Sequence, residues 1–67
     1  MKGNPATLVD IPTLVDIIRA LSITYTESGV VIWLGAWNTN LDGRPIDLCR
    51  TSEGKSRVAQ EAYRVAS

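Results

Sequence analysis

The chain has 67 residues, with one cysteine, no histidine, and seven basic residues that balance seven acidic ones. This length allows one domain at most, and the composition excludes both a disulfide within the chain and a zinc site built from Cys and His residues. Because so small a domain buries little surface and the balanced charge argues against nucleic acid as the main ligand, we expect self-association or docking onto another protein.

The N-terminal residues MKGNPA are polar and are interrupted by Gly and Pro. We therefore expect residues 1–10 to form a flexible N-terminus and residues 11–67 to form a single helical domain. The start of the chain does not resemble a signal peptide, and its longest apolar run, Val30–Leu34, is too short to span a bilayer. These features predict a soluble cytoplasmic protein.

The first predicted helix runs from about Pro12 to about Ile23. Its apolar residues recur at the spacing of one helical face, i, i+3, i+4 and i+7; they are Leu14, Ile17, Ile18 and Leu21. Pro12 suits the first turn of a helix, where its missing N–H leaves no hydrogen bond unmade.

Residues 22–34 allow two interpretations. Their β-branched and aromatic residues, on both sides of Glu27-Ser28-Gly29, slightly favour a β-hairpin. The alternative is a helix that Thr26 caps and that carries an apolar stripe, although its two glycines weaken it. The stripe would consist of Val30, Val31, Trp33, Leu34 and Trp37.

The segment after Trp37 predicts a turn followed by two helices. Its residues tolerate left-handed backbone or hydrogen-bond their own loop, and they are Asn38, Asn40, Asp42 and Gly43. Pro45 is expected to begin a short helix, with Ile46, Leu48 and Cys49 available for packing. Thr51 or Ser52 then caps a last helix through Ser67, whose packing face is Val58, Ala59, Ala62, Val65 and Ala66.

The sequence lacks the residue combinations that catalysis usually requires. Cys49 has no histidine to activate it, and the triplet Gly54-Lys55-Ser56 lacks the earlier glycine of a phosphate-binding loop, since that position is Cys49. We expect Asp47 and Glu53 to satisfy backbone N–H groups or to pair with arginines. The sequence therefore predicts a protein that is not an enzyme and needs no cofactor or metal.

An ordered set of residues runs through the second half of the chain. It comprises Trp33-Leu34, Asn38, Leu41-Asp42-Gly43, Pro45-Ile46-Asp47-Leu48, Thr51, Gly54 and Val58. This order resembles the toxin-binding domain of the Xre/MbcA/ParS antitoxin family, in which Trp-Leu, Asn, a Leu-x-Gly turn, a Pro-Leu-Asp-Leu-type helix start, Thr-x-x-Gly and Val follow one another. The spacing agrees from Pro45 to Val58, whereas the segment between Gly43 and Pro45 is one residue shorter than in the family.

The resemblance implies an all-α fold, a small bundle of about four short helices, and therefore a helix rather than a hairpin within residues 22–34. Longer members of the family carry an N-terminal DNA-binding region, for which this chain has no room before Pro12. The usual partner is a RES-domain toxin that destroys NAD, and the antitoxin blocks the entrance to its active site. The family often inhibits through residues near its C-terminus, where this chain is short.

On this basis the turn would depend on Gly43 for backbone freedom, on Leu41 as an anchor and on Pro45 for the next helix start. The other residues with predicted structural roles are Trp33, Asp47, Leu48, Thr51, Gly54 and Val58. The predicted partner-binding residues are Trp37, Asn38, Asn40, Arg44, Arg50, Arg57, Tyr63 and Arg64.

Two alternative functions remain open from the sequence. One is a small DNA-associated regulator of phage or prophage origin, with a basic face formed by Arg44, Arg50, Lys55, Arg57 and Arg64. The other is an oligomer that modulates a host protein without any RES-domain partner.

Overall fold

The computed structural model describes residues 12–67, which contain four α-helices and no β-strand. The helices are α2 (Leu14–Thr24), α3 (Glu27–Gly35), α4 (Pro45–Leu48) and α5 (Ser52–Ala66). This confirms the predicted all-α class with about four short helices. The predicted flexible terminus, residues 1–10, lies outside the described residues.

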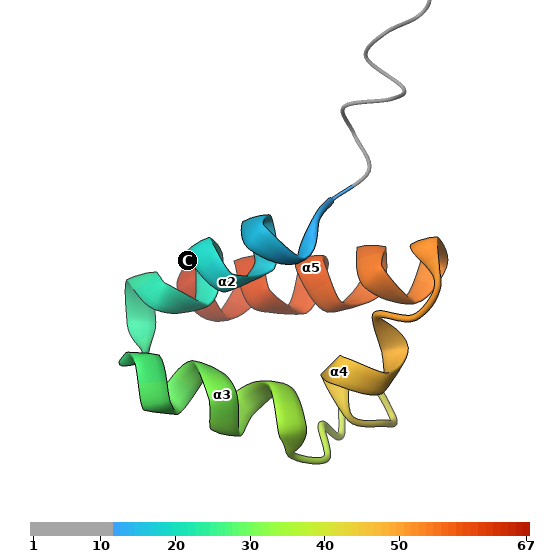
Figure 1. Ribbon diagram of the computed structural model, residues 1–67, viewed down its shortest axis with the longest axis horizontal. Coiled ribbons are helices and arrows are strands. Elements are labelled where there is room, and N and C mark those ends of the chain that lie inside the picture. Colours follow the sequence, from blue (N-terminus) through green and yellow to red (C-terminus); the bar gives the residue numbers. More distant parts are fainter. Residues whose placement is uncertain (1–11) are drawn as a thin grey trace, which may run out of the picture.

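The helices α2 and α5 lie side by side and run in the same direction (Figure 1). Their C-terminal ends are joined by a hydrogen bond in which Thr24 Oγ1 donates to the carbonyl oxygen of Val65 at 3.4 Å. Helix α3 returns below α2 in this view, and the short helix α4 connects the far end of α3 to the start of α5.

Helix α2 begins later than the sequence predicted, because Thr13 and not Pro12 marks its start. Thr13 is the N-cap, and its side chain accepts a hydrogen bond from the backbone N–H of Asp16 at 3.2 Å. The Asp16 carboxylate accepts in return from the backbone N–H of Thr13 at 2.9 Å. This reciprocal capping box satisfies two N–H groups at the helix start, so the helix needs no proline in its first turn.

Helix α3 replaces the hairpin that local propensity favoured. Thr26 is its N-cap and accepts from the backbone N–H of Gly29 at 3.2 Å, as the alternative interpretation required. The predicted apolar stripe is only partly packed, since Val30 is buried whereas the side chain of Val31 is 68% exposed. Trp37 lies beyond the helix, because the backbone becomes extended at Ala36.

The turn between α3 and α4 is closed by its own backbone. Asn38 and Gly43 exchange both N–H···O=C bonds, at 2.9 and 3.3 Å, and Leu41 is buried as the predicted anchor. The prediction for Gly43 was wrong, because the backbone with positive φ belongs to Asp42, at 57°. Aspartate as a residue type adopts this left-handed conformation more readily than most residues do.

The short helix α4 and the start of α5 are held very close together. Pro45 occupies the first turn of α4 and is fully buried, while Ile46, which was expected to be available for packing, is 41% exposed. Thr51, which was predicted together with Ser52 as a possible cap, is the N-cap of α5. Its side chain accepts a hydrogen bond from the backbone N–H of Gly54 at 2.9 Å. A Cβ atom at Gly54 would overlap the carbonyl oxygen of Leu48, so this contact requires glycine.

The core lies mainly along the seam between α2 and α5. Ile17 and Leu21 from α2 meet Val58 and Ala62 from α5, and all four side chains are fully buried. Val30 and Leu41 close the core from α3 and the turn. Full burial of each large side chain contributes about 1.5–3 kcal/mol, so this small cluster is the main apolar contribution to stability.

The two glycines at Gly54 and Gly35 provide a matched test of this packing. Gly54→Ala should lower the free energy of unfolding by about 3 kcal/mol, because the added methyl group meets backbone that cannot move freely. Gly35→Ala should instead raise it by about 0.5–1 kcal/mol, because nothing lies within 4 Å of its Cβ position and alanine favours the helix. Urea unfolding followed by circular dichroism measures both changes; equal effects would contradict the close α4–α5 contact.

Candidate protein-binding surface

A groove of about 380 Å³ lies between the turn of residues 38–43 and the C-terminal half of α5. Trp33 lines it from α3 and Trp37 from the segment after α3, while Asn40 lines it from the turn and Arg64 from α5. Trp33 is half-buried against the core, whereas Trp37 is 65% exposed. A large indole therefore stands at the edge of a groove that polar side chains complete.

The carboxylate of Glu61 fixes the polar side of this groove. Its side chain is only 10% exposed and accepts hydrogen bonds from Arg64, Nε at 3.0 Å and a terminal nitrogen at 2.6 Å. It also accepts from Asn40 Nδ2 at 3.0 Å. The bonds from Arg64, with a smaller contribution from Asn40, hold the pKa of Glu61 below its ordinary value although burial raises it.

Arg57 makes a second connection between α5 and the turn. One of its terminal nitrogens donates to the carbonyl oxygen of Leu41 at 3.0 Å. Arg57 also lines an adjoining groove of about 280 Å³, which shares Asn40, Glu61 and Arg64 with the first one. We call the surface formed by Trp37, Asn38, Asn40, Arg57 and Arg64 the Trp37 surface; it brings together five of the eight predicted partner-binding residues.

Asn38 has an internal role within this surface. Its side-chain oxygen accepts from the backbone N–H of Leu41 at 3.1 Å, in addition to the backbone bonds with Gly43. Asn38 is accordingly only half-exposed. The structure thus explains this asparagine by turn formation, and its contact with a partner stays a prediction.

Arg44 and Arg50 form a separate group on and beside α4. Arg44 binds Asp47 with two hydrogen bonds, at 2.9 and 3.2 Å, and Arg50 lies 3.9 Å from the same carboxylate. The Arg44 guanidinium, and less strongly Arg50, lowers the pKa of Asp47, and the carboxylate raises the pKa of Arg44. The predicted pairing of Asp47 with arginine is confirmed, and Arg44 already has a bidentate partner within the chain.

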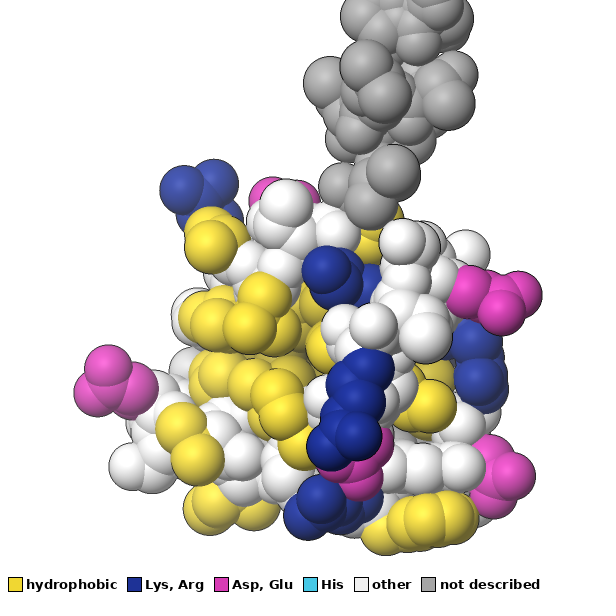
Figure 2. Space-filling view, turned by 45° about the vertical axis from the view of Figure 1, so that its right-hand side comes forward, with side chains coloured by type: hydrophobic (Ala, Val, Ile, Leu, Met, Phe, Trp, Pro, Cys, Tyr) yellow, Lys and Arg dark blue, Asp and Glu magenta, His cyan; other side chains and the backbone are white. Residues whose placement is uncertain are grey.

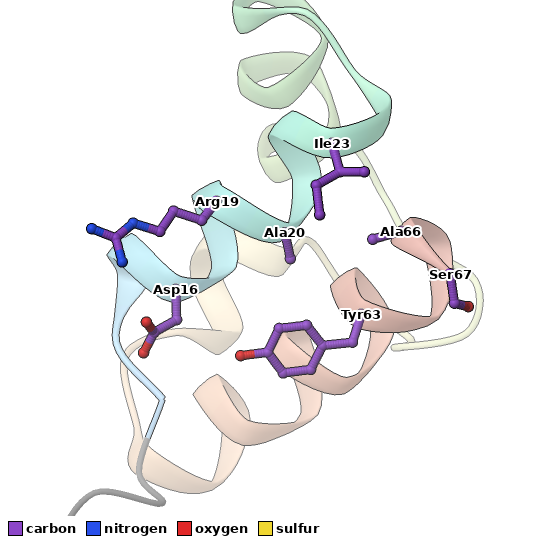
Figure 3. A pocket seen from close by; sticks show the side chains of 7 residues that line it. All are labelled: Asp16, Arg19, Ala20, Ile23, Tyr63, Ala66 and Ser67. Atoms are coloured by element: carbon purple, nitrogen blue, oxygen red, sulfur yellow. The ribbon is translucent and has the colours of Figure 1, made fainter.

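Tyr63 lies in a different groove, between α2 and α5. This groove has a volume of about 390 Å³ and shares no lining residue with the Trp37 surface. Figure 3 shows the ring of Tyr63 lying across it, with the hydroxyl group toward Asp16 and with Ala20 and Ile23 nearby on α2. The structure therefore separates Tyr63 from the other predicted contact residues.

Glu61 is the residue at these grooves that the sequence did not predict. Its spacing of three positions from Arg64 is a recognisable helical ion pair, and this signal could have identified it. Its bond to Asn40 joins residues 21 positions apart, so no local pattern could have shown it.

Within residues 12–67, no group of His, Cys, Asp and Glu side chains is placed to hold a metal ion. Burial raises the pKa of the half-buried Cys49 thiol, although Lys55 opposes this, so the neutral thiol is favoured. None of the four helices has the length and hydropathy to cross a membrane.

Comparisons with protein families, curated proteins and solved structures found no match for this chain. The resemblance of residues 33–58 to the toxin-binding domain of Xre/MbcA/ParS antitoxins therefore stays a prediction from the sequence.

The Glu61 hydrogen bonds predict a specific response to acid. Because the folded-state pKa of Glu61 lies below its ordinary value of 4.5, their stabilisation is complete above that pH and is lost as the pH falls through the folded-state pKa. Glu61→Gln should lower the free energy of unfolding by about 1 kcal/mol at pH 7 and should flatten its decline below pH 4.5. Part of the decline should remain, since the pKa values of Asp16 and Asp47 are also lowered. Urea titrations of both proteins across this range measure the slopes; parallel slopes would contradict the assignment.

Proposed function

We propose that this chain is a non-catalytic, antitoxin-like protein-binding module whose Trp37 surface binds and neutralises a RES-type, NAD-degrading toxin. The observation that carries the proposal is the exposure of Trp37, 65% of whose surface is accessible at the edge of a groove. Tryptophan and arginine supply most of the binding energy in protein interfaces, and both residue types meet here.

The geometry of Trp37 favours a partner over a role in the core. Trp33 already provides the packed indole of α3, and the extended backbone after Ala36 brings Trp37 outside that packing. Removing so large an apolar surface from water would be favourable, and a protein partner is the ordinary way to achieve this.

The polar groups of the Trp37 surface are ordered before any partner arrives. Glu61 holds the guanidinium of Arg64, and Leu41 O holds that of Arg57. Side chains that are already oriented lose less conformational freedom on binding, so more of the contact energy remains as affinity. An ordered guanidinium also favours a planar carboxylate on the partner.

The same contacts count against the DNA-associated alternative. Of the five residues proposed for a basic face, Arg44, Arg57 and Arg64 donate hydrogen bonds to acceptors of their own chain. Phosphate binding depends on cations whose charge is free to replace counterions. The internal pairing of Arg44 and Arg64 with carboxylates reduces that charge and supports a protein ligand.

Co-expression with a RES-domain toxin encoded in the same genome tests the proposal. The native chain should restore growth and should co-purify with the toxin. Trp37→Ala should weaken the complex by at least tenfold, because loss of a central interface tryptophan costs about 2 kcal/mol or more. Ile23→Ala is the matched control, since Ile23 is 74% exposed and does not line this surface; it should leave the complex intact.

Three results would contradict this proposal. One is failure of the native chain to rescue growth or to co-purify with any RES-domain toxin of its genome. Another is equal binding by the Trp37→Ala protein. A third is salt-sensitive binding of the native chain to DNA with affinity greater than for the toxin, which would support the nucleic-acid alternative instead.

A further inference from the structure

Helix α3 exposes apolar side chains away from the core. Val30 is buried, yet Val31 and Ile32 on the other sides of the helix are 68% and 69% exposed. Glu27 is the helix's single charged residue. A helix that is apolar on all sides is normally buried by neighbouring elements on several sides. In a single chain, α3 is buried on one side and exposed on the others.

The exposed part of α3 continues onto α2. A groove of about 520 Å³ between these helices is lined by Ile18 and Ser22 from α2 and by Val31 and Leu34 from α3. We call these four residues the α2–α3 face. Figure 2 shows hydrophobic side chains gathered in a band on the left of the view, where α2 and α3 lie one above the other. This face shares no residue with the Trp37 surface.

Two side chains of opposite charge flank the α2–α3 face. Arg19 is exposed on α2 beside Ile18, at the boundary with the α2–α5 groove, which it also lines, and Glu27 lines the α2–α3 groove at the start of α3. Neither side chain belongs to an ion pair among residues 12–67. Asp16, the acid nearest to Arg19 along α2, is already bound to Thr13 through its carboxylate.

We infer that the α2–α3 face is the interface of a symmetric homodimer, in which Arg19 of each copy pairs with Glu27 of the other. A two-fold axis through the groove places α2 of one copy against α3 of its partner, so each contact occurs twice. The face then meets an equally apolar face, and its two flanking charges each meet the opposite charge. The chain has no net charge that would oppose this association.

A second copy fits this face better than an unrelated ligand does. The apolar centre and the two opposite charges are self-complementary, which an isologous interface requires. Dimerisation also supplies the buried surface that a chain of this length lacks. The dimer leaves both copies of the Trp37 surface free, so it offers two equivalent binding sites.

Charge reversal tests the reciprocal pairing directly. Sedimentation of the full chain over a range of concentrations should show a monomer–dimer equilibrium. Arg19→Glu and Glu27→Arg should each weaken the dimer about tenfold or more, because each places like charges together at two points. An equimolar mixture of the two variants should dimerise as tightly as the native chain, since both ion pairs are restored in the heterodimer.

The controls separate the interface from the fold. Val31→Glu should abolish dimerisation while the helical circular dichroism is retained, because Val31 contributes little to the core. Arg50→Glu reverses a charge outside the α2–α3 face and should leave the dimer unchanged. The inference is overturned if the full chain is monomeric at every concentration. It is overturned equally if mixing the two variants restores nothing, which would mean that residues 1–11 or another surface governs the association.

Discussion

The attachment of the turn 38–43 to α5 determines where most of the candidate binding residues lie. The Glu61 carboxylate binds Arg64 on its own helix and Asn40 in the turn, and Arg57 binds the carbonyl oxygen of Leu41. The bonds of Glu61 with Asn40 and of Arg57 with Leu41 join α5 to residues 21 and 16 positions earlier, and the bonds between Glu61 and Arg64 lie within α5. Because the turn is fastened in this way, the residues before it are fixed too, and Trp37 is held at the rim of the groove rather than free to fold onto the core.

The close packing of α5 against α2 and α4 depends on small residues at two places. Ala59 and Ala62 allow α2 to approach α5 closely, and Gly54 allows the Leu48 carbonyl to touch the start of the helix. These contacts bury the core along one side of α2 and the inner side of α3. The remaining sides of both helices have no further helix to cover them within residues 12–67. Because the described chain has only four short helices, it forms a compact core and also leaves apolar side chains of α2 and α3 exposed.

The sequence predicted the features that depend on neighbouring residues. Thr26 and Thr51 were identified as possible helix caps because an N-cap needs only its own side chain and the next turn. The predicted helix start at Pro12 was too early, since Thr13 is the N-cap of α2 and forms a capping box with Asp16. The prediction for Gly43 was also wrong, because Asp42 adopts the left-handed backbone.

The hairpin that local propensity favoured within residues 22–34 followed from the β-branched composition, but capping by Thr26 and burial of Val30 outweighed that preference. The bond between Asn40 and Glu61 depends on tertiary structure and has no local signal.

The arginines show why residue type alone does not define a binding surface. Exposed arginine was a reasonable criterion for partner contact, and Arg44, Arg57 and Arg64 met it in the sequence. In the folded chain Arg44 pairs with Asp47 on the short helix α4, whereas Arg64 pairs with Glu61 in the groove that Trp37 also lines. Both arginines are paired with a carboxylate of the chain, so pairing alone does not distinguish them as binding residues. What distinguishes Arg64 is its position between a fixed carboxylate and an exposed indole, where one ligand can contact a planar cation and an apolar ring at once.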